Sequence, residues 1–174
     1  MTEKGSWKQY SEGAVTHSGA HYLMAVHQLQ KELGYARGVD VARLLEVSPP
    51  SVTLGLERLQ SRGLLKDDRN RFYSLTDVGS RTVESILAHR RILQRFFEEI
   101  LGVDPQTAEA DACRIEHLIS DVTSRKLIQC LNLLSFDPDL QLIKKRLLEL
   151  GDSPNCSFPD GCGICESACI LHQS

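Results

Sequence analysis

The chain has 174 residues, of which 41% are apolar and 25% charged, and its formal net charge is −3. Such a composition is typical of a globular protein that buries a core without disulfides, and the net charge gives no support to nucleic-acid binding beyond a local basic patch. The first twenty residues hold no apolar signal segment, and no run approaches the roughly 20 apolar residues of a membrane span, so we expect a cytoplasmic protein with no membrane partner and reduced thiols.

The first half of the chain predicts helices followed by a hairpin. Apolar residues recur at helical spacing, as in HYLMAVHQLQKEL, and Gly34 and Gly63 are stop signals. A polar DDRN turn between two short apolar runs predicts the hairpin. The expected segments are helices at 21–33, 39–47 and 51–63 and a hairpin over 64–75. This order is that of a winged helix-turn-helix, whose recognition helix enters the major groove of DNA. We therefore predict a DNA-binding domain over 18–75, preceded by an N-terminal arm over 1–17.

The recognition helix and the wing carry the candidate DNA contacts. Ser48 fits an N-cap with Pro49 at the first helical position, and a helix N-terminus favours a phosphate. The segment from Ala36 to Leu75 contains seven basic and five acidic side chains, which gives it a net charge of +2. The candidate residues are Ser48, Pro49, Pro50, Ser51, Thr53 and Arg58 on the helix and Arg69 and Arg71 on the wing. The alternative is a winged-helix interaction module that touches no DNA.

The second half predicts further helices, over 76–102, 105–120, 121–135 and 137–151. Pro105 and Asp121 stand at helix starts, and Pro138 fits a first helical position after Asp137. Apolar stripes on 76–101 and 121–134 are expected either to form a dimer surface or to close a monomer core. The fold class is therefore mainly α, with a winged helix-turn-helix followed by a helical domain.

One of these helices carries a candidate metal site. Cys113, Glu116 and His117 in DACRIEHLIS have i, i+3, i+4 spacing, which places them on one helical face. A thiolate, a carboxylate and an imidazole suit Fe(II), Mn(II), Co(II), Ni(II) or Zn(II), and His89 and His21 are candidates for further ligands. The alternative is an ordinary helix whose cysteine fills the core. The chain lacks the HExxH motif of zinc proteases.

These stretches resemble the family of the diphtheria toxin repressor and the manganese transport regulator, which are metal-activated bacterial repressors. The resemblance runs from about Gly19 to Leu134, through HYLMAVHQL, VDVARLLEVSPPSVTLGLERLQSRGLL, LTDVGSR, HRRILQRFFEEILGVD and DACRIEHLISD. It implies a repressor of metal-homeostasis genes, not an enzyme, that binds a palindromic double-stranded DNA operator as a homodimer. The helices over 76–150 would form its metal-binding and dimerisation domain.

The resemblance also implies a ligand set. His89, Glu116 and His117 match family ligands, and Cys113 matches a position that is Cys in the iron branch and Glu in the manganese branch. His21 stands where relatives have Met or Asp. Each branch has a second metal site with a carboxylate that this chain lacks: Leu93 stands at that position of the iron branch, and Met24 at that of the manganese branch. Glu109 stands at a histidine position of the iron branch's second site and could still coordinate. We therefore expect one main site, formed by His21, His89, Cys113, Glu116 and His117. Its thiolate shifts the metal preference toward Fe(II) or Zn(II) and away from Mn(II). We expect Fe(II), with Mn(II) and Zn(II) as alternatives.

The tail over 151–174 lies beyond the resemblance, where the iron branch has a barrel domain. Four of the chain's six cysteines fall here with C-x5-C-x2-C-x3-C spacing: Cys156, Cys162, Cys165 and Cys169. So compact a run favours a [4Fe–4S] cluster, with zinc or a redox-sensing or disulfide pair as alternatives. The sequence thus leaves open an iron–sulfur sensor on the same scaffold, and, as a third hypothesis, a metalloenzyme or electron carrier.

Overall fold

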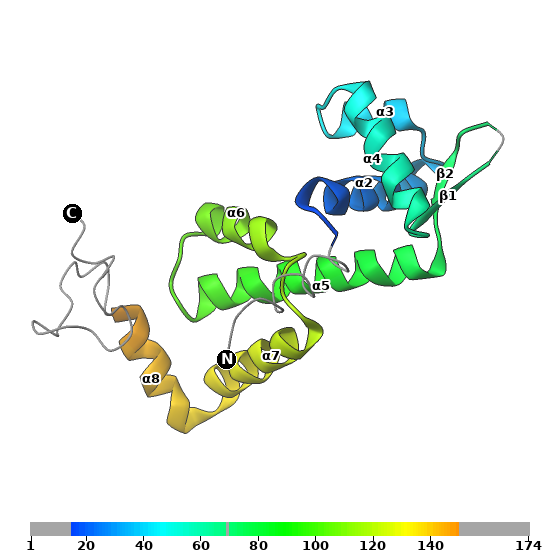
Figure 1. Cartoon of the computed structure of the whole chain (residues 1–174). Helices are drawn as coiled ribbons and strands as arrows, with labels where there is room; N and C mark the ends of the chain where they lie inside the picture. The colour runs from blue at the N-terminus through cyan, green and yellow to red at the C-terminus, as the bar shows by residue number, and fades with distance from the viewer. Residues whose placement is uncertain (1–14, 69, 150–174) are drawn as a thin grey trace, which may run out of the picture.

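The structure, a computed structural model, describes residues 15–68 and 70–149, and these form helices and one small hairpin (Figure 1). In chain order the elements are α2 (His17–Leu33), α3 (Gly38–Leu44), α4 (Pro49–Ser61), β1 (Leu65–Asp67), β2 (Tyr73–Leu75), α5 (Asp77–Glu99), α6 (Pro105–Ile115), α7 (Asp121–Phe136) and α8 (Pro138–Glu149). The two strands pair antiparallel, with Leu65 opposite Leu75. The predicted mainly helical fold with a hairpin wing is confirmed. The N-terminal arm before residue 15 and the cysteine-rich tail lie outside the described residues.

Apolar side chains at helical spacing join α2, α3 and α4 around one core. Leu23, Val26, Val41, Val52 and Leu56 are fully buried in it. The ends of these helices follow local signals. Gly34 ends α2 with a φ of +79°, which glycine adopts without strain. Ser48 is the N-cap of α4, but its hydroxyl lies 2.7 Å from the Ser51 hydroxyl and caps no backbone N–H.

The helix α2 begins four residues before its predicted start. The apolar stripe suggested a start at His21, but the Thr16 hydroxyl accepts a hydrogen bond from the Gly19 backbone N–H at 3.2 Å and caps a helix that begins at His17. Because four residues make about one helical turn, His17 lies one turn before His21 on the same face.

The contact between α2 and α4 depends on a glycine. A Cβ atom on Gly55 would lie 2.1 Å from Cε2 of Tyr22, which no side chain tolerates. Glycine therefore lets the recognition helix α4 approach the Tyr22 ring directly. The orientation of α4 is fixed by α2 through this contact.

The long helix α5 connects the two halves. The winged helix-turn-helix lies at its N-terminal end, and α6 and α7 pack against it farther along (Figure 1). Thr76 caps α5 by accepting from the Gly79 N–H at 3.0 Å, and it also donates to the Gly63 carbonyl at 2.7 Å. This double contact ties the start of α5 to the end of α4.

The apolar stripes of α5 and α7 have different surroundings. On α5, Val83, Ile86 and Leu93 are buried within the chain, so this stripe closes the monomer core, as the alternative interpretation expected. On α7, Leu133 is 54% exposed and Phe136 is 77% exposed. Exposed apolar side chains continue along α8, among them Leu142 and Ile143.

Candidate metal centre

Titratable side chains from three helices meet where α2, α5 and α6 come together. They are His17 and His21 on α2, Arg90 on α5, Cys113 on α6, and Glu116 and His117 just beyond it. The Cys113 Sγ lies 3.3 Å from the His21 Nε2, although the two residues are 92 positions apart. This contact joins the winged helix-turn-helix to the helical domain. It brings together two of the five residues predicted as ligands.

His17 belongs to the same cluster, although the sequence analysis missed it. Its ring centroid lies 4.6 Å from that of His21 and 5.3 Å from that of His117. One ligand atom each from His17, His21 and Cys113 all lie within 4.8 Å of one another. Ligands of one tetrahedral Zn(II), at bond lengths of about 2.0–2.3 Å, stand about 3.5 Å apart. The three side chains therefore need only small movements to share a cation. The signal was present in the cap at Thr16 and the i, i+4 spacing of the two histidines.

Glu116 lies at the end of α6, and its carboxylate is occupied. The residue has no solvent exposure, and Arg90 holds both its oxygens: Nε donates to Oε2, and Nη2 donates to Oε1 at 2.8 Å. Arg90 Nη2 also lies 3.7 Å from the Cys113 Sγ. A bidentate guanidinium compensates a buried carboxylate well. In this arrangement both carboxylate oxygens of Glu116 already accept hydrogen bonds from Arg90, which would compete with a metal for them.

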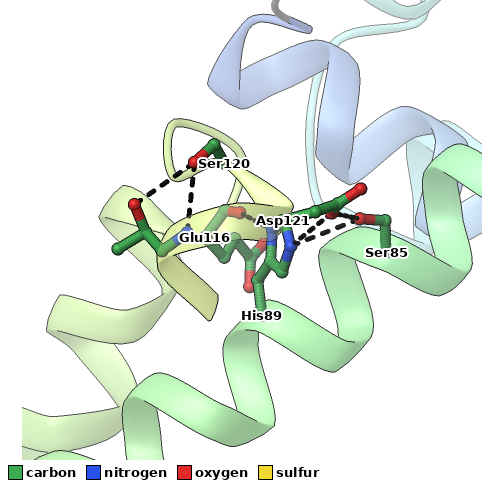
Figure 2. A network of polar contacts seen from close by, with 6 residues as sticks. Ser85, His89, Glu116, Ser120 and Asp121 are labelled. Carbon is green, nitrogen blue, oxygen red and sulfur yellow. Dashed lines mark hydrogen bonds and ion pairs between the residues drawn. The ribbon is translucent and has the colours of Figure 1, made fainter. Parts of the chain in front are cut away.

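His89 is buried on α5 and uses both ring nitrogens elsewhere (Figure 2). Its Nδ1 lies 3.0 Å from the Glu116 carbonyl oxygen, and its Nε2 lies 3.0 Å from the Asp121 Oδ1. Ser85 donates to the same Asp121 oxygen at 2.9 Å and lies 3.3 Å from the His89 Nε2. The two ring nitrogens of His89 are therefore engaged by Glu116 and Asp121, not by His21 or Cys113.

The predicted helix over 105–120 ends at Ile115, with Glu116 as its C-cap, still in helical conformation and bonded through its N–H to the Ala112 carbonyl. The Glu116 carbonyl oxygen lies 3.0 Å from the His89 Nδ1 of α5. The Leu118 N–H donates to the Ile115 carbonyl at 2.9 Å, which closes a turn after the helix. His117 follows this turn. Its Nδ1 is buried without a hydrogen-bond partner among the described residues. A buried imidazole nitrogen with a lone pair and no partner suits a metal ligand.

Burial favours the neutral form of two of these imidazoles, those of His21 and His117. Burial, and next the neighbouring His17, lower the pKa of His21 and of His117 below the usual histidine value. Burial raises the pKa of the Cys113 thiol, an effect that Arg90 partly opposes. At neutral pH His21 and His117 therefore have free lone pairs, while Cys113 has to lose a proton before its sulfur can ligate.

Nitrogen and sulfur donors that converge from α2 and α6 fit a divalent transition metal. Surface hollows of about 510 and 530 Å³ flank the cluster, one lined by His21 and Arg90 and the other by Glu116 and His117. They give a cation access from solvent. The arrangement can link two helices through a metal.

The candidate DNA contacts lie on an exposed surface. Ser48, Pro49, Pro50, Ser51, Thr53 and Arg58 are exposed at α4, and Arg71 is exposed next to β2. The Thr53 hydroxyl donates to the Pro49 carbonyl at 3.1 Å. Arg69 lies outside the described residues. Arg37, not singled out from the sequence, stacks on Tyr35 and Phe72 at 5.0 and 4.8 Å from the ring centroids and adds a cation near the wing.

The predicted tail ligands, Cys156, Cys162, Cys165 and Cys169, lie outside the described residues. Within residues 15–68 and 70–149, no helix is both long and apolar enough to cross a bilayer.

Comparison with known proteins adds family information. Residues 15–71 match the model of the iron dependent repressor N-terminal DNA binding domain, and residues 76–145 match the iron dependent repressor metal binding and dimerisation domain. The chain is 31% identical to the iron-dependent repressor IdeR of Mycobacterium leprae, over 78% of this chain and 59% of that protein. It is 36% identical to the HTH-type transcriptional regulator MntR of Shouchella clausii, over 60% of this chain and 73% of that protein.

Among solved structures, the crystal structure of ScaR with bound Zn²⁺ superposes with a TM-score of 0.57 at 29% identity, covering 66% of this chain and 53% of that one. The chain spans about three fifths of the length of the IdeR relatives it matches.

Proposed function

The chain belongs to the diphtheria toxin repressor and manganese transport regulator family of metal-dependent transcriptional repressors, and we propose that it represses metal-homeostasis genes in response to a divalent metal. The observation that carries this proposal is the contact of 3.3 Å between His21 and Cys113. It spans the two parts that the family models describe, the DNA-binding domain and the metal-binding and dimerisation domain. Members of the family are DNA-binding regulators and not enzymes.

The proposed effect of the metal is geometric. A divalent cation, when bound, would supply a crosslink between α2 and α6. His21 then holds α2, and with it the recognition helix, in one position relative to the dimerisation helices. A palindromic operator requires a fixed separation of two recognition helices, so the protein population with that separation gains affinity. A coupling of about 1–3 kcal/mol is enough to change operator occupancy.

DNA binding in this proposal uses the exposed start of α4 and the wing. Arg58 and Arg71 are exposed cations suited to phosphates, and the Ser48 and Ser51 hydroxyls are exposed at the start of α4, whose first two positions are prolines without an N–H. Dimerisation uses the exposed apolar side chains of α7 and α8, which a second copy of the chain would cover. Both contacts are expected of a cytoplasmic regulator.

The metal is proposed to be Fe(II) or Zn(II), with Mn(II) less suited. Fe(II) is the metal that the iron branch of the family suggests, and it accepts a carboxylate such as Glu116 alongside imidazoles. Use of Glu116 requires the Arg90 ion pair to open. Use of His89 requires the ring to leave Asp121. The cysteine-rich tail is proposed to hold a [4Fe–4S] cluster or zinc, which acid-labile sulfide and metal analysis of anaerobically purified protein would distinguish.

The experiment that tests the repressor proposal selects double-stranded DNA from a random pool with metal-loaded protein, then measures fluorescence anisotropy of the selected DNA with Fe(II), Zn(II), Mn(II) or EDTA. We expect metal to raise affinity at least tenfold, in line with about 1.4 kcal/mol of coupling. Cys113→Ser should lose this response. Cys130→Ser, which changes another half-buried thiol, on α7, should keep it. DNA affinity that ignores every metal would refute the proposal.

A further inference from the structure

We propose that His17 is a metal ligand and that, with His21, Cys113 and His117, it completes a site of three imidazoles and one thiolate that selects Zn(II). This inference deepens the proposed function and rests on it for the regulatory consequence of binding. The location of the site rests on the geometry alone. It differs from the ligand set expected from the resemblance, because it includes His17 and leaves out Glu116 and His89.

Two residues of the expected ligand set already have other bonding partners. Both Glu116 oxygens are held by Arg90, and both His89 nitrogens have partners in the Glu116 carbonyl and Asp121. Freeing the carboxylate would leave the half-buried Arg90 guanidinium unpaired close to a dication, which is electrostatically unfavourable. The expected five-ligand site therefore has two members with other bonding partners.

The position of His17 suits a metal ligand. It lies one helical turn before His21, so both imidazoles emerge from the same face of α2. The T-shaped packing of the two rings, with centroids 4.6 Å apart, brings their nitrogens near the Cys113 Sγ. Because the Thr16 cap fixes the first turn of α2, the His17 backbone is already positioned before any metal arrives.

His117 is the remaining residue of the proposed site. Its Nδ1 is buried without a partner among the described residues, and its ring lies beside His17, with centroids 5.3 Å apart. A polar nitrogen left in this state destabilises the protein unless a ligand or water satisfies it. His117 lies outside the group of ligand atoms that stand within 4.8 Å of one another, so its ring has to move toward a metal held by His17 and Cys113. Four donors are the number that Zn(II) takes in closed sites.

The donor set also bears on the metal preference. Three imidazoles and a thiolate present only nitrogen and sulfur, and no carboxylate. Zn(II) favours tetrahedral sites of histidine and cysteine, whereas Mn(II) prefers oxygen donors and higher coordination. With the carboxylate of Glu116 reserved for Arg90, the site loses the oxygen donor that would favour Mn(II) or a six-coordinate Fe(II).

The test uses the full chain with the four tail cysteines changed to alanine, so that the tail does not compete for metal. Co(II) serves as a spectroscopic substitute for Zn(II), and Zn(II) affinity is measured by competition with a chromophoric chelator. We expect a thiolate-to-cobalt charge-transfer band and the intense visible bands of tetrahedral Co(II). His17→Gln should keep the thiolate band, convert the visible bands to the weak ones of higher coordination, and lower Zn(II) affinity about tenfold or more. His17→Cys should restore tetrahedral bands with a stronger charge-transfer band.

His27→Gln is the matched control, because His27 lies on the same helix about 15 Å along its axis from His17. It should change neither the spectrum nor the affinity. Far-UV circular dichroism without metal confirms that the His17 variants fold, as expected for an exposed residue. The inference is overturned if Co(II) in the parent protein is octahedral, or if His17→Gln binds Zn(II) as tightly as the parent. If the spectrum and affinities behave as expected but DNA affinity ignores Zn(II), the proposed function fails and the ligand assignment stands.

Discussion

The ion pair between Arg90 and Glu116 predicts an unusual stability effect of a single substitution. Arg90→Met removes the guanidinium but keeps most of the apolar stem that packs between α5 and α6. The Glu116 carboxylate would then be fully buried without its partner. Breaking a buried pair from one side typically destabilises a protein by about 3–5 kcal/mol, because the remaining charge keeps its desolvation penalty. We expect a loss toward the lower end, near 3 kcal/mol, because the Arg90 side chain is itself 26% exposed and water can partly replace it.

Metal should reverse part of this loss. Without Arg90, the Glu116 carboxylate near His21 and Cys113 would have no paired charge. It would attract a Zn(II) ion bound at this cluster, whereas in the parent protein the Arg90 guanidinium repels that ion. The unfolding free energy of Arg90→Met should therefore rise more on addition of zinc than that of the parent protein. Ligand binding to the folded state stabilises it by RT ln(1 + [L]/Kd), so tighter binding appears directly as a larger shift.

The assay is urea denaturation followed by far-UV circular dichroism, at one fixed protein concentration, with EDTA and with Zn(II). Arg95→Met is the matched control, because Arg95 lies on the same helix and pairs with Glu99 at a solvent-exposed position. Its loss should be small, since exposed ion pairs contribute little. The double variant Arg90→Met/Glu116→Gln should recover much of the stability, because it leaves no buried charge. If Arg90→Met is no less stable than Arg95→Met, the ion pair does not have the role assigned to it.

Further outcomes follow from the contacts of α4, α7 and the metal cluster. Gly55→Ala should destabilise the protein by about 1–3 kcal/mol and weaken DNA binding, because its Cβ would enter the Tyr22 ring; unaltered unfolding and DNA curves would contradict this. Phe136→Glu should shift a dimer to monomer in analytical ultracentrifugation, and an unchanged sedimentation coefficient would remove α7 from the interface. Because burial raises the pKa of Cys113, zinc affinity should fall as pH falls, and binding at neutral pH should release about one proton. Calorimetry in buffers of different ionisation enthalpy, on the chain without tail cysteines, measures this number; the same release from Cys113→Ser would assign the proton elsewhere.

The elements themselves could be predicted well from the sequence because their signals are local. Gly34 and the apolar stripe of α2 gave one end of that helix correctly. The predicted start of the helix was wrong, because the apolar stripe does not reach back to His17. The Thr16 cap extends the helix one turn beyond that stripe. The end of α6 was wrong for a different reason. The carbonyl and carboxylate of Glu116 bind His89 and Arg90 on α5, and such tertiary contacts have no sequence-local signal.

The candidate site could be predicted only in part. The resemblance identified Cys113 and His21, which the structure brings together. It could not reveal Arg90 as the partner of Glu116, because an arginine in HRRIL has the pattern of an ordinary helix surface residue. The Asp121 contact of His89 joins residues 32 positions apart and likewise has no local signal. The full ligand set stays a prediction that the metal-binding experiments address.

The path from the cluster to the recognition helix is short. His21 and Tyr22 are adjacent on α2, and they face different neighbours. His21 contacts Cys113 of α6, while the Tyr22 ring lies directly against Gly55 of α4 without room for a Cβ atom. A displacement of α2 toward α6 therefore has to displace α4, because there is no gap in between to absorb it. Close-packed contacts of this kind transmit small movements, and a bistable arrangement of helices can amplify them. If His17 and His21 bind a metal as proposed, the helix that carries them is also the helix that contacts α4, so metal binding would act on the DNA-binding surface through a single packed contact.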